Sequence, residues 1–455
     1  MKTRHAPVVR RNRAPLVAVA ALLLAPFSDS GARADDASPE PDAAAKPYSL
    51  HGESTFVWQA NAPFRALYSG DNSLRAHGQG RETLSATMFV GLRLWRGGEL
   101  YINPEMFQGF GLAGTHGLAG FPNGEAQKGG TAVPEVYLAR GFVRQTFGLG
   151  GETEKVEDGP NQIAGQRDVA RLTWTTGKLA PVDIFDGNSY ARDPRDNFLN
   201  WSIYSHGAFD YAADQKGYGW GTVLDFNQKN WALRGGYFLE PKFSNSERFD
   251  LDIPRRGQYL LELETRHQIA GQAGKIRYLG WFARANAGNF REAVADPAFD
   301  PSGSIEATRR TRTLYGVGVS LEQAITADLG LFARASLRDG RNEVMAWTDV
   351  DRSVTAGLAL KGTAWRRPDD TIGFAGVLNG LGRDYRRYLA AGGLGINIGD
   401  GQLSYRPEAV LETYYSLAVR RNVFLTLDYQ FAPSPAYNAD RGPVSIGAMR
   451  LHAHF

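Results

Sequence analysis

The dominant pattern along the chain is an alternation of apolar and polar residues. In residues 423–431 (VFLTLDYQF) every odd position is apolar, and three of the four even positions are polar. A period of two predicts a β-strand with one apolar and one polar face. The pattern recurs and predicts sixteen strands, at residues 50–60, 84–95, 99–107, 170–178, 182–187, 217–226, 231–240, 257–268, 274–286, 311–325, 329–339, 352–363, 370–381, 408–419, 422–432 and 444–455.

The connections between these strands alternate in length. Short ones at 96–98, 179–181, 227–230, 269–273, 326–328, 364–369 and 420–421 separate longer ones at 61–83, 108–169, 188–216, 241–256, 287–310, 340–351, 382–407 and 433–443. A soluble β-sandwich has no reason to sort its loops, whereas outer-membrane barrels combine short periplasmic turns with long extracellular loops. We therefore predict an all-β fold, a 16-stranded antiparallel transmembrane β-barrel.

Two segments in the long connections have apolar residues at helical spacing. Residues 135–147 carry Leu138 and Phe142 at this spacing, and residues 384–391 show it as well. We interpret both as short helices within loops, the first in the longest loop, 108–169.

The N-terminus has the three parts of a secretory signal. Five basic residues in 1–13 precede an apolar stretch at 14–27, and Ala32-Arg33-Ala34 offers a small-x-small cleavage site. We predict a cleaved signal peptide at 1–34, a flexible periplasmic lead-in at 35–49 and the barrel at 50–455, exported to the bacterial outer membrane.

Composition narrows the possibilities further. The 455 residues include no Cys, which excludes disulfides, thiolate metal sites and a Cys nucleophile. The 51 Lys and Arg nearly balance the 48 Asp and Glu, and six of the basic residues lie in the predicted signal peptide. The electrostatic field of such a chain is too weak to indicate nucleic-acid binding. No run reaches the ~18 apolar residues of a membrane helix.

Sixteen strands enclose a water-filled channel, so the alternation also predicts which side chains face the lumen. Charged residues of both signs fall on this face, which favours a neutral, hydroxyl-rich solute over an ion. A role in bracing the wall is the alternative for each of them. They are Arg93, Glu99, Glu105, Arg234, Glu262, Glu264, Arg284, Arg334, Arg338, Glu412 and Asp428.

Aromatic residues are expected on both faces. Sugars need aromatic surfaces against their C–H groups as well as polar partners for their hydroxyls. The inward candidates are Tyr101, Tyr278, Phe282 and Tyr414. Four tryptophans are assigned to the girdles at the membrane interfaces: Trp95, Trp220, Trp231 and Trp281.

The last predicted strand ends in an aromatic residue. Phe455 shares a face with Ala453, Leu451 and Met449, while His452 and His454 take the lumen face. A terminal aromatic on such a strand resembles the assembly signal of outer-membrane barrels. We therefore expect the barrel-assembly machinery and outer-membrane lipids among the partners.

Other motifs carry little chemistry. The G-x-G-x-x-G at 109–114 lacks a surrounding crossover unit, and His452 with His454 would bind a metal only weakly. The lumen assignment offers no neighbouring Ser and His for a hydrolase, so we expect no catalytic residue, metal or cofactor. A barrel-borne hydrolase stays a minor alternative, and a general diffusion porin without a sugar site is the main one.

The stretch GKLAPVDIFDGNSYARDPR at 177–195, followed by NFLNW at 197–201, resembles the carbohydrate-selective porin (OprB) family. Residues 99–105, 218–221, 230–237 and 432–438 are similar to it as well. The resemblance implies a sixteen-stranded channel for glucose and other small neutral sugars, narrowed by inward-folded loops. It implies 108–169 as the constricting loop and, as lining, Asp183, Asp186 and Asn188 with the inward Glu105, Arg234, Glu262 and Arg284. Asp193 and Pro194 are expected to shape the loop instead.

Overall fold

The computed structural model describes residues 46–300 and 304–455. The predicted signal peptide, and residues 35–45 of the predicted lead-in, lie outside the described residues. The first strand begins at Tyr48.

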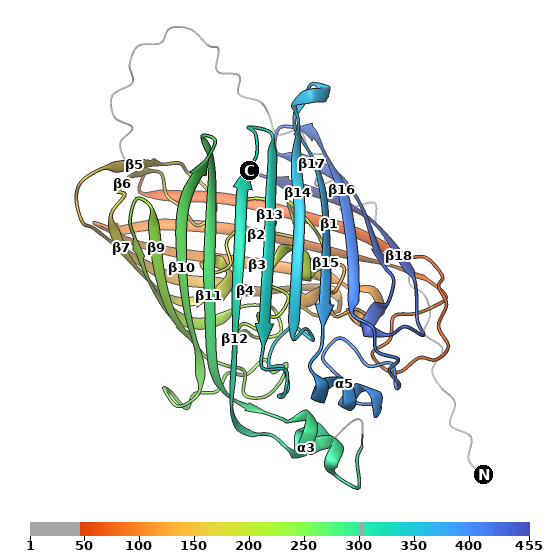
Figure 1. Cartoon of the computed structure of the whole chain (residues 1–455). Coiled ribbons are helices and arrows are strands. Elements are labelled where there is room, and N and C mark those ends of the chain that lie inside the picture. Colours follow the sequence, from red (N-terminus) through yellow and green to blue (C-terminus); the bar gives the residue numbers. More distant parts are fainter. Residues whose placement is uncertain (1–45, 301–303) are drawn as a thin grey trace. The chain divides into compact units, whose positions relative to one another are not determined.

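Sixteen strands form one closed antiparallel barrel, which confirms the predicted fold class (Figure 1). Neighbours in the barrel are neighbours in chain order, and β1 pairs with β18 to close the sheet. Closure leaves no strand edge to be satisfied within a membrane. The strands are β1 (Tyr48–Asn61), β2 (Gln79–Trp95), β3 (Gly98–Gly109), β4 (Thr131–Gly148), β7 (Arg171–Leu179), β8 (Gly219–Asn227), β9 (Trp231–Phe238), β10 (Gly257–Ile269), β11 (Gln272–Ala287), β12 (Arg310–Ala324), β13 (Leu329–Arg338), β14 (Arg352–Gly362), β15 (Arg367–Gly380), β16 (Glu408–Arg420), β17 (Val423–Ala432) and β18 (Val444–His454).

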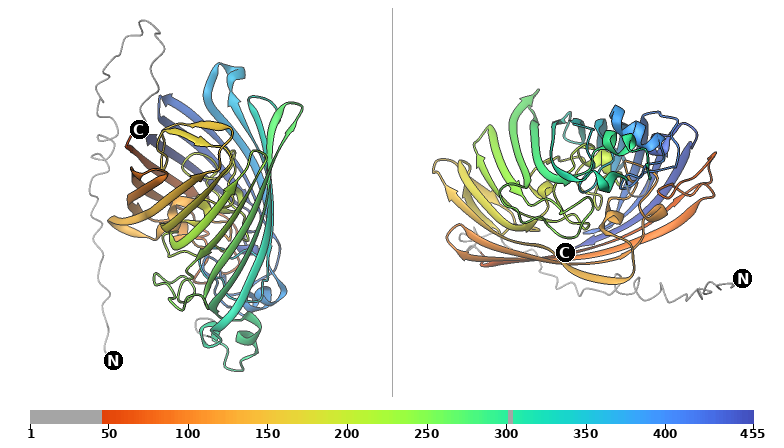
Figure 2. Two further views of the ribbon diagram at one scale, coloured as in Figure 1. Left: turned by 90° about the vertical axis from the view of Figure 1, so that its left-hand side faces the viewer. Right: turned by 90° about the horizontal axis from the view of Figure 1, so that it is seen from below.

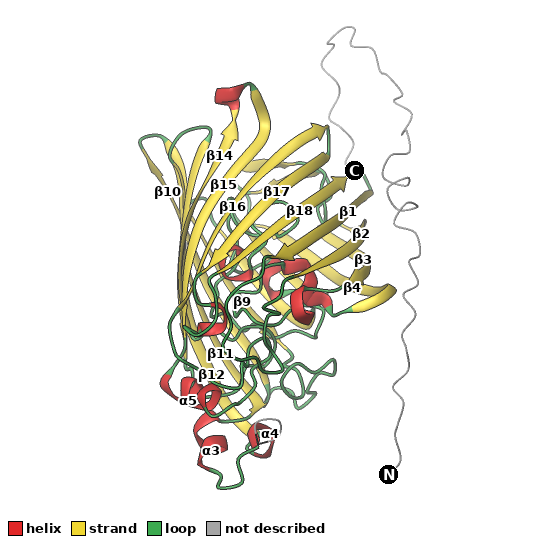
Figure 3. Ribbon diagram, turned by 90° about the vertical axis from the view of Figure 1, so that its right-hand side faces the viewer, coloured by secondary structure: helices red, strands yellow, loops and turns green. Residues whose placement is uncertain are grey.

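The loops are sorted by length, as predicted. Both ends of the barrel-forming chain lie with the short turns, and the opposite end carries the long loops with their helices (Figures 1 and 3). These helices include α3 (Phe290–Ala295), α4 (Ser304–Ala307) and α5 (Arg383–Ala390). The last confirms the helix predicted at 384–391. One connection on the short-turn side is long, because it carries the hairpin of β5 (Thr153–Val156) and β6 (Gly165–Asp168).

The helix predicted at 135–147 is wrong, because this segment belongs to β4. It pairs with β3 on one side and β7 on the other. The register shifts at Ala139, where β3 pairs Asn103 with Arg140 but Pro104 with Leu138. Such a β-bulge moves the apolar positions from one parity to the other, so a period of two looks like helical spacing.

The strand predicted at 182–187 is also wrong. Residues 181–183 form a 3-10 turn, η3 (Pro181–Asp183), and the chain then enters a long loop at 180–218 that connects β7 to β8. The Asp183 carboxylate accepts the backbone N–H of Ala180 at 2.9 Å, and Asp186 adopts a φ of +55°. As a result of these two errors, two predicted connections are wrong as well: the short turn at 179–181 and the single loop at 108–169. The count of sixteen survives because one strand replaces another.

The predicted facing of β11 requires correction. Glu262 and Glu264 of β10 are buried on the inner face, and they pair directly with Leu279 and Arg277 of β11. Odd positions of β11 therefore face inward. Tyr278, Phe282 and Arg284, predicted to line the lumen, lie on the outer face and are exposed there.

The four tryptophans divide between the two faces. Trp95, Trp220 and Trp231 are exposed on the wall, as expected for girdle residues. Trp281 is buried inside, with its ring 5.0 Å from that of Phe209 in the inner loop. None of the helices among the described residues is long and apolar enough to cross a membrane.

We expect a single spin label at Tyr278→Cys to report lipid, because this position faces outward. The chain has no other Cys, so labelling is specific. The label should collide more often with oxygen, which concentrates in the membrane, than with a water-soluble nickel complex. Asp193→Cys, exposed in the inner loop, is the aqueous control. Equal aqueous contact at both positions would contradict the assigned facing.

Candidate site in the barrel lumen

The loop at 180–218, here called the inner loop, folds into the barrel instead of projecting from it (Figure 2). It contains one helical turn, α2 (Trp201–Tyr204), which begins after Asn200; the Asn200 side chain accepts the N–H of Ser202. Its large apolar side chains are buried against the inner wall. The ring of Phe198, for example, packs against those of Phe332 and Tyr414 of the wall, with ring centres 5.5 and 5.0 Å apart.

Carboxylates of the wall hold this loop by its backbone. A buried loop has no strand partner for its N–H groups, and unpaired buried N–H groups are costly. Three wall glutamates accept them: Glu262 from Asp186 at 2.8 Å, Glu322 from Ser189 at 2.8 Å, and Glu412 from Leu199 and Asn200 at 2.5 and 3.0 Å.

Two wall arginines donate hydrogen bonds to carbonyl groups of the same loop. Arg334 donates to the carbonyls of Ala191 and Ile203 at 2.7 and 3.1 Å and to the carboxylate of Asp186 at 3.0 Å. Arg450 donates to the carbonyls of Pro194 and Asn197 at 2.6 and 2.7 Å. Ionised partners make these hydrogen bonds stronger than neutral ones.

The loop between β3 and β4, residues 110–130, enters the barrel in the same way. Glu408 accepts the N–H groups of Ala119 and Gly120 at 3.0 and 2.7 Å. Gln59 and Gln430 both donate to the carbonyl of Pro122 at 2.8 Å. Two loops, both fixed by wall side chains, thus occupy the lumen.

A cavity of about 440 Å³ remains between these two loops and the wall. Five aromatic side chains contribute to its lining: Phe89, Trp201, Tyr204, Tyr211 and Tyr218. The rings of Trp201 and Tyr204 meet edge to face at 5.5 Å, and those of Trp201 and Tyr211 lie 5.8 Å apart. The indole N–H of Trp201 has no hydrogen-bond partner among the described residues.

Charged side chains of both signs complete the lining. Five are basic and five acidic: Lys128, Arg140, Arg192, Arg195 and Lys216, with Glu53, Glu125, Asp183, Asp193 and Asp196. The cavity therefore carries no strong excess of either sign, unlike an ion-selective filter.

Arg195 is the centre of the buried part of this charge network. Its guanidinium contacts Glu105 at 2.9 Å, Glu125 at 3.0 Å and also Glu53, while Lys128 lies 3.0 Å from both Glu105 and Glu125. Burial alone would raise the pKa of Glu125, but Arg195 and Lys128 outweigh it and lower this pKa to about 2. Glu125 therefore stays ionised and paired.

The exposed part of the lining contains groups with unused hydrogen-bonding capacity. Arg140 forms a bidentate pair with Asp183, at 2.7 and 2.6 Å, and lies 5.0 Å from the ring centre of Tyr218. Arg192 is exposed and donates to the backbone carbonyls of Val182 and Asp183. Asp196 is exposed as well, with His452 at 3.5 Å.

Most of the residues predicted from the sequence fall into four groups. Asp183 and Asn188 line the cavity, and Glu105 supports it through Arg195 and Lys128. Asp186, Glu262 and Glu412 hold the inner loop. Asp428 and Tyr414 are buried on the inner wall, and Tyr278, Phe282 and Arg284 lie outside.

The other predicted residues lie elsewhere on the inner wall. Arg234 bridges Asp225, Glu262 and Glu264 at 3.1, 2.7 and 3.2 Å. Tyr101 lines a second cavity of about 290 Å³, where its hydroxyl donates to Glu99 at 2.8 Å. These contacts stabilise the wall and stay apart from the main cavity's lining.

The principal side chains of the cavity were not predicted from the sequence. Arg195, Trp201 and Tyr204 lie in or beside the stretch that resembles the sugar porins, and this position could have identified them. Arg140 was hidden because β4 was interpreted as a helix. No group of three or more His, Asp or Glu side chains in the described part of the chain is placed to hold a metal ion.

A closed sixteen-stranded barrel with inward-folded loops defines a porin, an open outer-membrane channel. Residues 71–455 match the sequence model of the carbohydrate-selective porin, OprB family. This chain belongs to that family. Its fold and family are those of a channel for carbohydrates and not of an enzyme.

The same fold is found in a solved structure. The chain is similar to Pseudomonas putida OprB in its high-pH structure, with 16% identity, a TM-score of 0.67, and 90% of this chain and 94% of that one covered. It also matches the channel DcaP of Acinetobacter baumannii, with 10% identity, a TM-score of 0.47 and coverage of 90% and 97%. None of the curated proteins matches this chain.

We expect Arg334→Met to loosen the inner loop. It leaves the buried Asp186 carboxylate without its guanidinium, a change that costs about 3–5 kcal/mol in comparable buried pairs. Added protease should then cleave within residues 180–218 of the folded barrel, as mapped by mass spectrometry. The control Arg284→Met, on the outer wall, should stay resistant. Resistance in both variants would show that the loop does not depend on Arg334.

A second prediction concerns His206 of the inner loop. Burial lowers the pKa of this imidazole from 6.5 to about 4, although Asp186 at 3.6 Å opposes the shift. The folded state therefore favours neutral His206, whose contribution to stability is complete above pH 6.5 and is lost as the pH falls through about 4. The loss is at most about 3 kcal/mol.

This sign is testable with His206→Phe, which keeps a ring but does not titrate. The midpoint of thermal unfolding should fall between pH 7 and pH 4 more in the native chain than in the variant. An identical fall in both would mean that His206 does not contribute.

Proposed function

We propose that this chain is an outer-membrane channel through which small neutral sugars such as glucose diffuse into the periplasm, and that the sugar contacts the cavity between the two inner loops. The observation that supports this most is the combination of five aromatic side chains with ten charged ones of balanced sign in one cavity of about 440 Å³.

The chemistry of this lining suits a monosaccharide. Aromatic faces can contact its C–H surfaces, while guanidinium groups donate to its hydroxyls and carboxylates accept from them. The exposed Arg192 and Asp196 are the candidates for these hydrogen bonds. Replacing water on each hydroxyl lets the sugar pass without a large desolvation cost.

The balance of charge supports a neutral solute. The buried carboxylates and guanidiniums are already paired with one another, so a bound ion would find no compensating excess of charge. An uncharged solute needs none. The alternative is a general diffusion porin, which does not require balanced charge in its lumen. Measurements of sugar binding would distinguish the two kinds of channel.

Export to the outer membrane is part of the same proposal. Residues 1–34 carry the signal peptide features described above, and recognition of Phe455 by the barrel-assembly machinery belongs to the same proposal. Cleavage after Ala34 would appear as a new N-terminus in protein purified from the outer membrane.

The test is ion current through the purified protein in a planar bilayer, recorded while glucose is titrated. We expect glucose to reduce the current saturably, because a sugar bound in the cavity obstructs ions. Arg192→Ala and Asp196→Asn should each raise the half-blocking concentration about three- to tenfold, since a hydrogen bond to a charged group contributes about 1.5–3 kcal/mol before screening by solvent. Trp201→Phe should raise it less.

The control is Arg284→Ala, which removes an arginine from the outer wall and should leave block unchanged. A channel that conducts but is never blocked by sugar would identify a general diffusion porin. Unchanged block in the Arg192 and Asp196 variants would place the sugar elsewhere in the lumen.

A further inference from the structure

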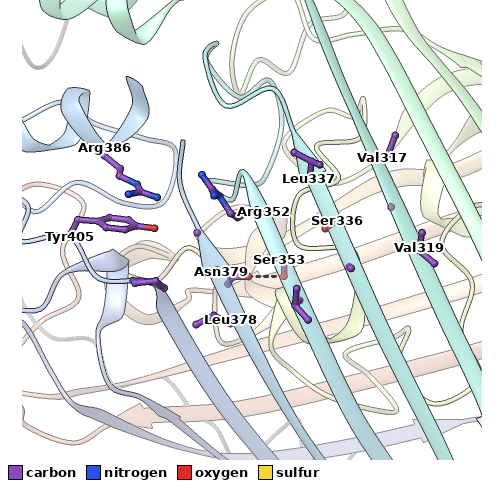
Figure 4. Close-up of a pocket in the computed structure, with 15 residues that line it drawn as sticks. Val317, Val319, Ser336, Leu337, Arg352, Ser353, Leu378, Asn379, Arg386 and Tyr405 are labelled. Atoms are coloured by element: carbon purple, nitrogen blue, oxygen red, sulfur yellow. Dashed lines mark hydrogen bonds between the residues drawn. The ribbon is translucent and has the colours of Figure 1, made fainter. Parts of the chain in front are cut away.

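The outer wall carries a groove of about 450 Å³ across strands β12 to β15 (Figure 4). Its floor consists of outward side chains in two neighbouring rows across the strands. One row is Val319, Ala335, Val354 and Leu378, and the other is Val317, Leu337, Arg352 and Gly380. Ala335 and Gly380 are short members of these rows, so the wall is hollow between the larger side chains.

One end of the groove is bounded by two arginines. Arg352 begins β14, and its side chain crosses Gly380 so closely that a Cβ there would lie 3.0 Å from the Arg352 Cγ. Arg386 comes from α5, with its guanidinium 3.7 Å from the ring centre of Tyr405. Both guanidiniums donate to the same carbonyl, that of Leu381, at 3.1 and 2.9 Å.

These two guanidiniums have no carboxylate within 4 Å among the described residues. A guanidinium has five N–H donors, and each of these uses one on the shared carbonyl. Most arginines of the inner wall, by contrast, are paired with carboxylates. Two adjacent positive charges with free donors therefore stand at the long-loop rim, next to an apolar hollow.

We propose that this groove binds a phosphorylated lipid, with an acyl chain in the hollow and the phosphate held by Arg352 and Arg386. Guanidinium groups match phosphate oxygens in bidentate geometry. Acyl chains suit the row of Val, Ala and Leu side chains, because both are apolar and pack by van der Waals contact. The long-loop rim is the extracellular end of such a barrel, so the lipid belongs to the outer leaflet.

A second copy of this chain is a less suitable occupant. Packing the same face of another barrel here would bury the two arginines without an opposing charge, which is costly. The inference does not depend on the proposed sugar site, because the groove lies on the opposite side of the wall.

Native mass spectrometry of the delipidated full-length barrel tests the proposal. The probes are dioleoyl phosphatidic acid and dioleoylglycerol, which share acyl chains and differ in the phosphate. We expect phosphatidic acid to bind roughly tenfold or more tightly than dioleoylglycerol. The double variant Arg352→Ala with Arg386→Ala should lose this preference. Arg284→Ala, an outer-wall arginine that does not border the groove, should keep it.

Filling the groove gives an independent test. Ala335→Phe should weaken binding of both lipids, whereas Ala333→Phe, two residues away on the same face of β13, should not. Heat-modified mobility on a gel verifies that each variant is folded. Undiminished phosphatidic acid binding by the double arginine variant would overturn the proposal. So would a native oligomer that Ala335→Phe converts to monomers, since a second copy would then cover this face.

Discussion

The hydrogen bonds between Glu and Arg side chains of the wall and the backbone of the inner loop are the interaction on which this architecture depends. A loop inside a barrel has no strand to pair with, so its N–H and C=O groups need other partners. The N–H groups donate hydrogen bonds to Glu262, Glu322 and Glu412. The carbonyl groups accept hydrogen bonds from Arg334 and Arg450. The wall charges thus determine where the loop lies, and the loop in turn positions the aromatic side chains of the cavity.

The barrel could be predicted from the sequence because membrane and lumen impose opposite polarity on alternate residues. The prediction failed where that rule is interrupted. At Ala139 a bulge changes the parity of β4, and in β11 the lumen side is apolar, because Leu279 and Trp281 contact the filling loop and not water. Outward aromatics such as Tyr278 then resemble lumen residues. The strand prediction at 182–187 failed for a related reason, since these residues are buried or half-buried inside the barrel without belonging to a strand.

The site was less predictable than the fold. Parity correctly placed Glu105, Glu262 and Glu412 on the inner face, but it could not show that the loop backbone uses the last two. Nor could it show that Arg195 gathers three carboxylates from separate elements of the chain. Such arrangements depend on the path of two loops in space, and a local period contains no information about that path. Only the resemblance to the sugar porins indicated the right stretch of sequence.

Because loops fill the lumen, evolutionary changes of the barrel wall and of the cavity can occur independently. Strand number and register are fixed by the closed sheet, and altering them means rebuilding the whole barrel. The cavity, in contrast, is lined largely by side chains of the inner loop and of residues 110–130. Substitutions or insertions there can retune which solutes pass while the wall keeps its membrane-facing surface. Related barrels can therefore come to transport different solutes while the wall still assembles in the same way.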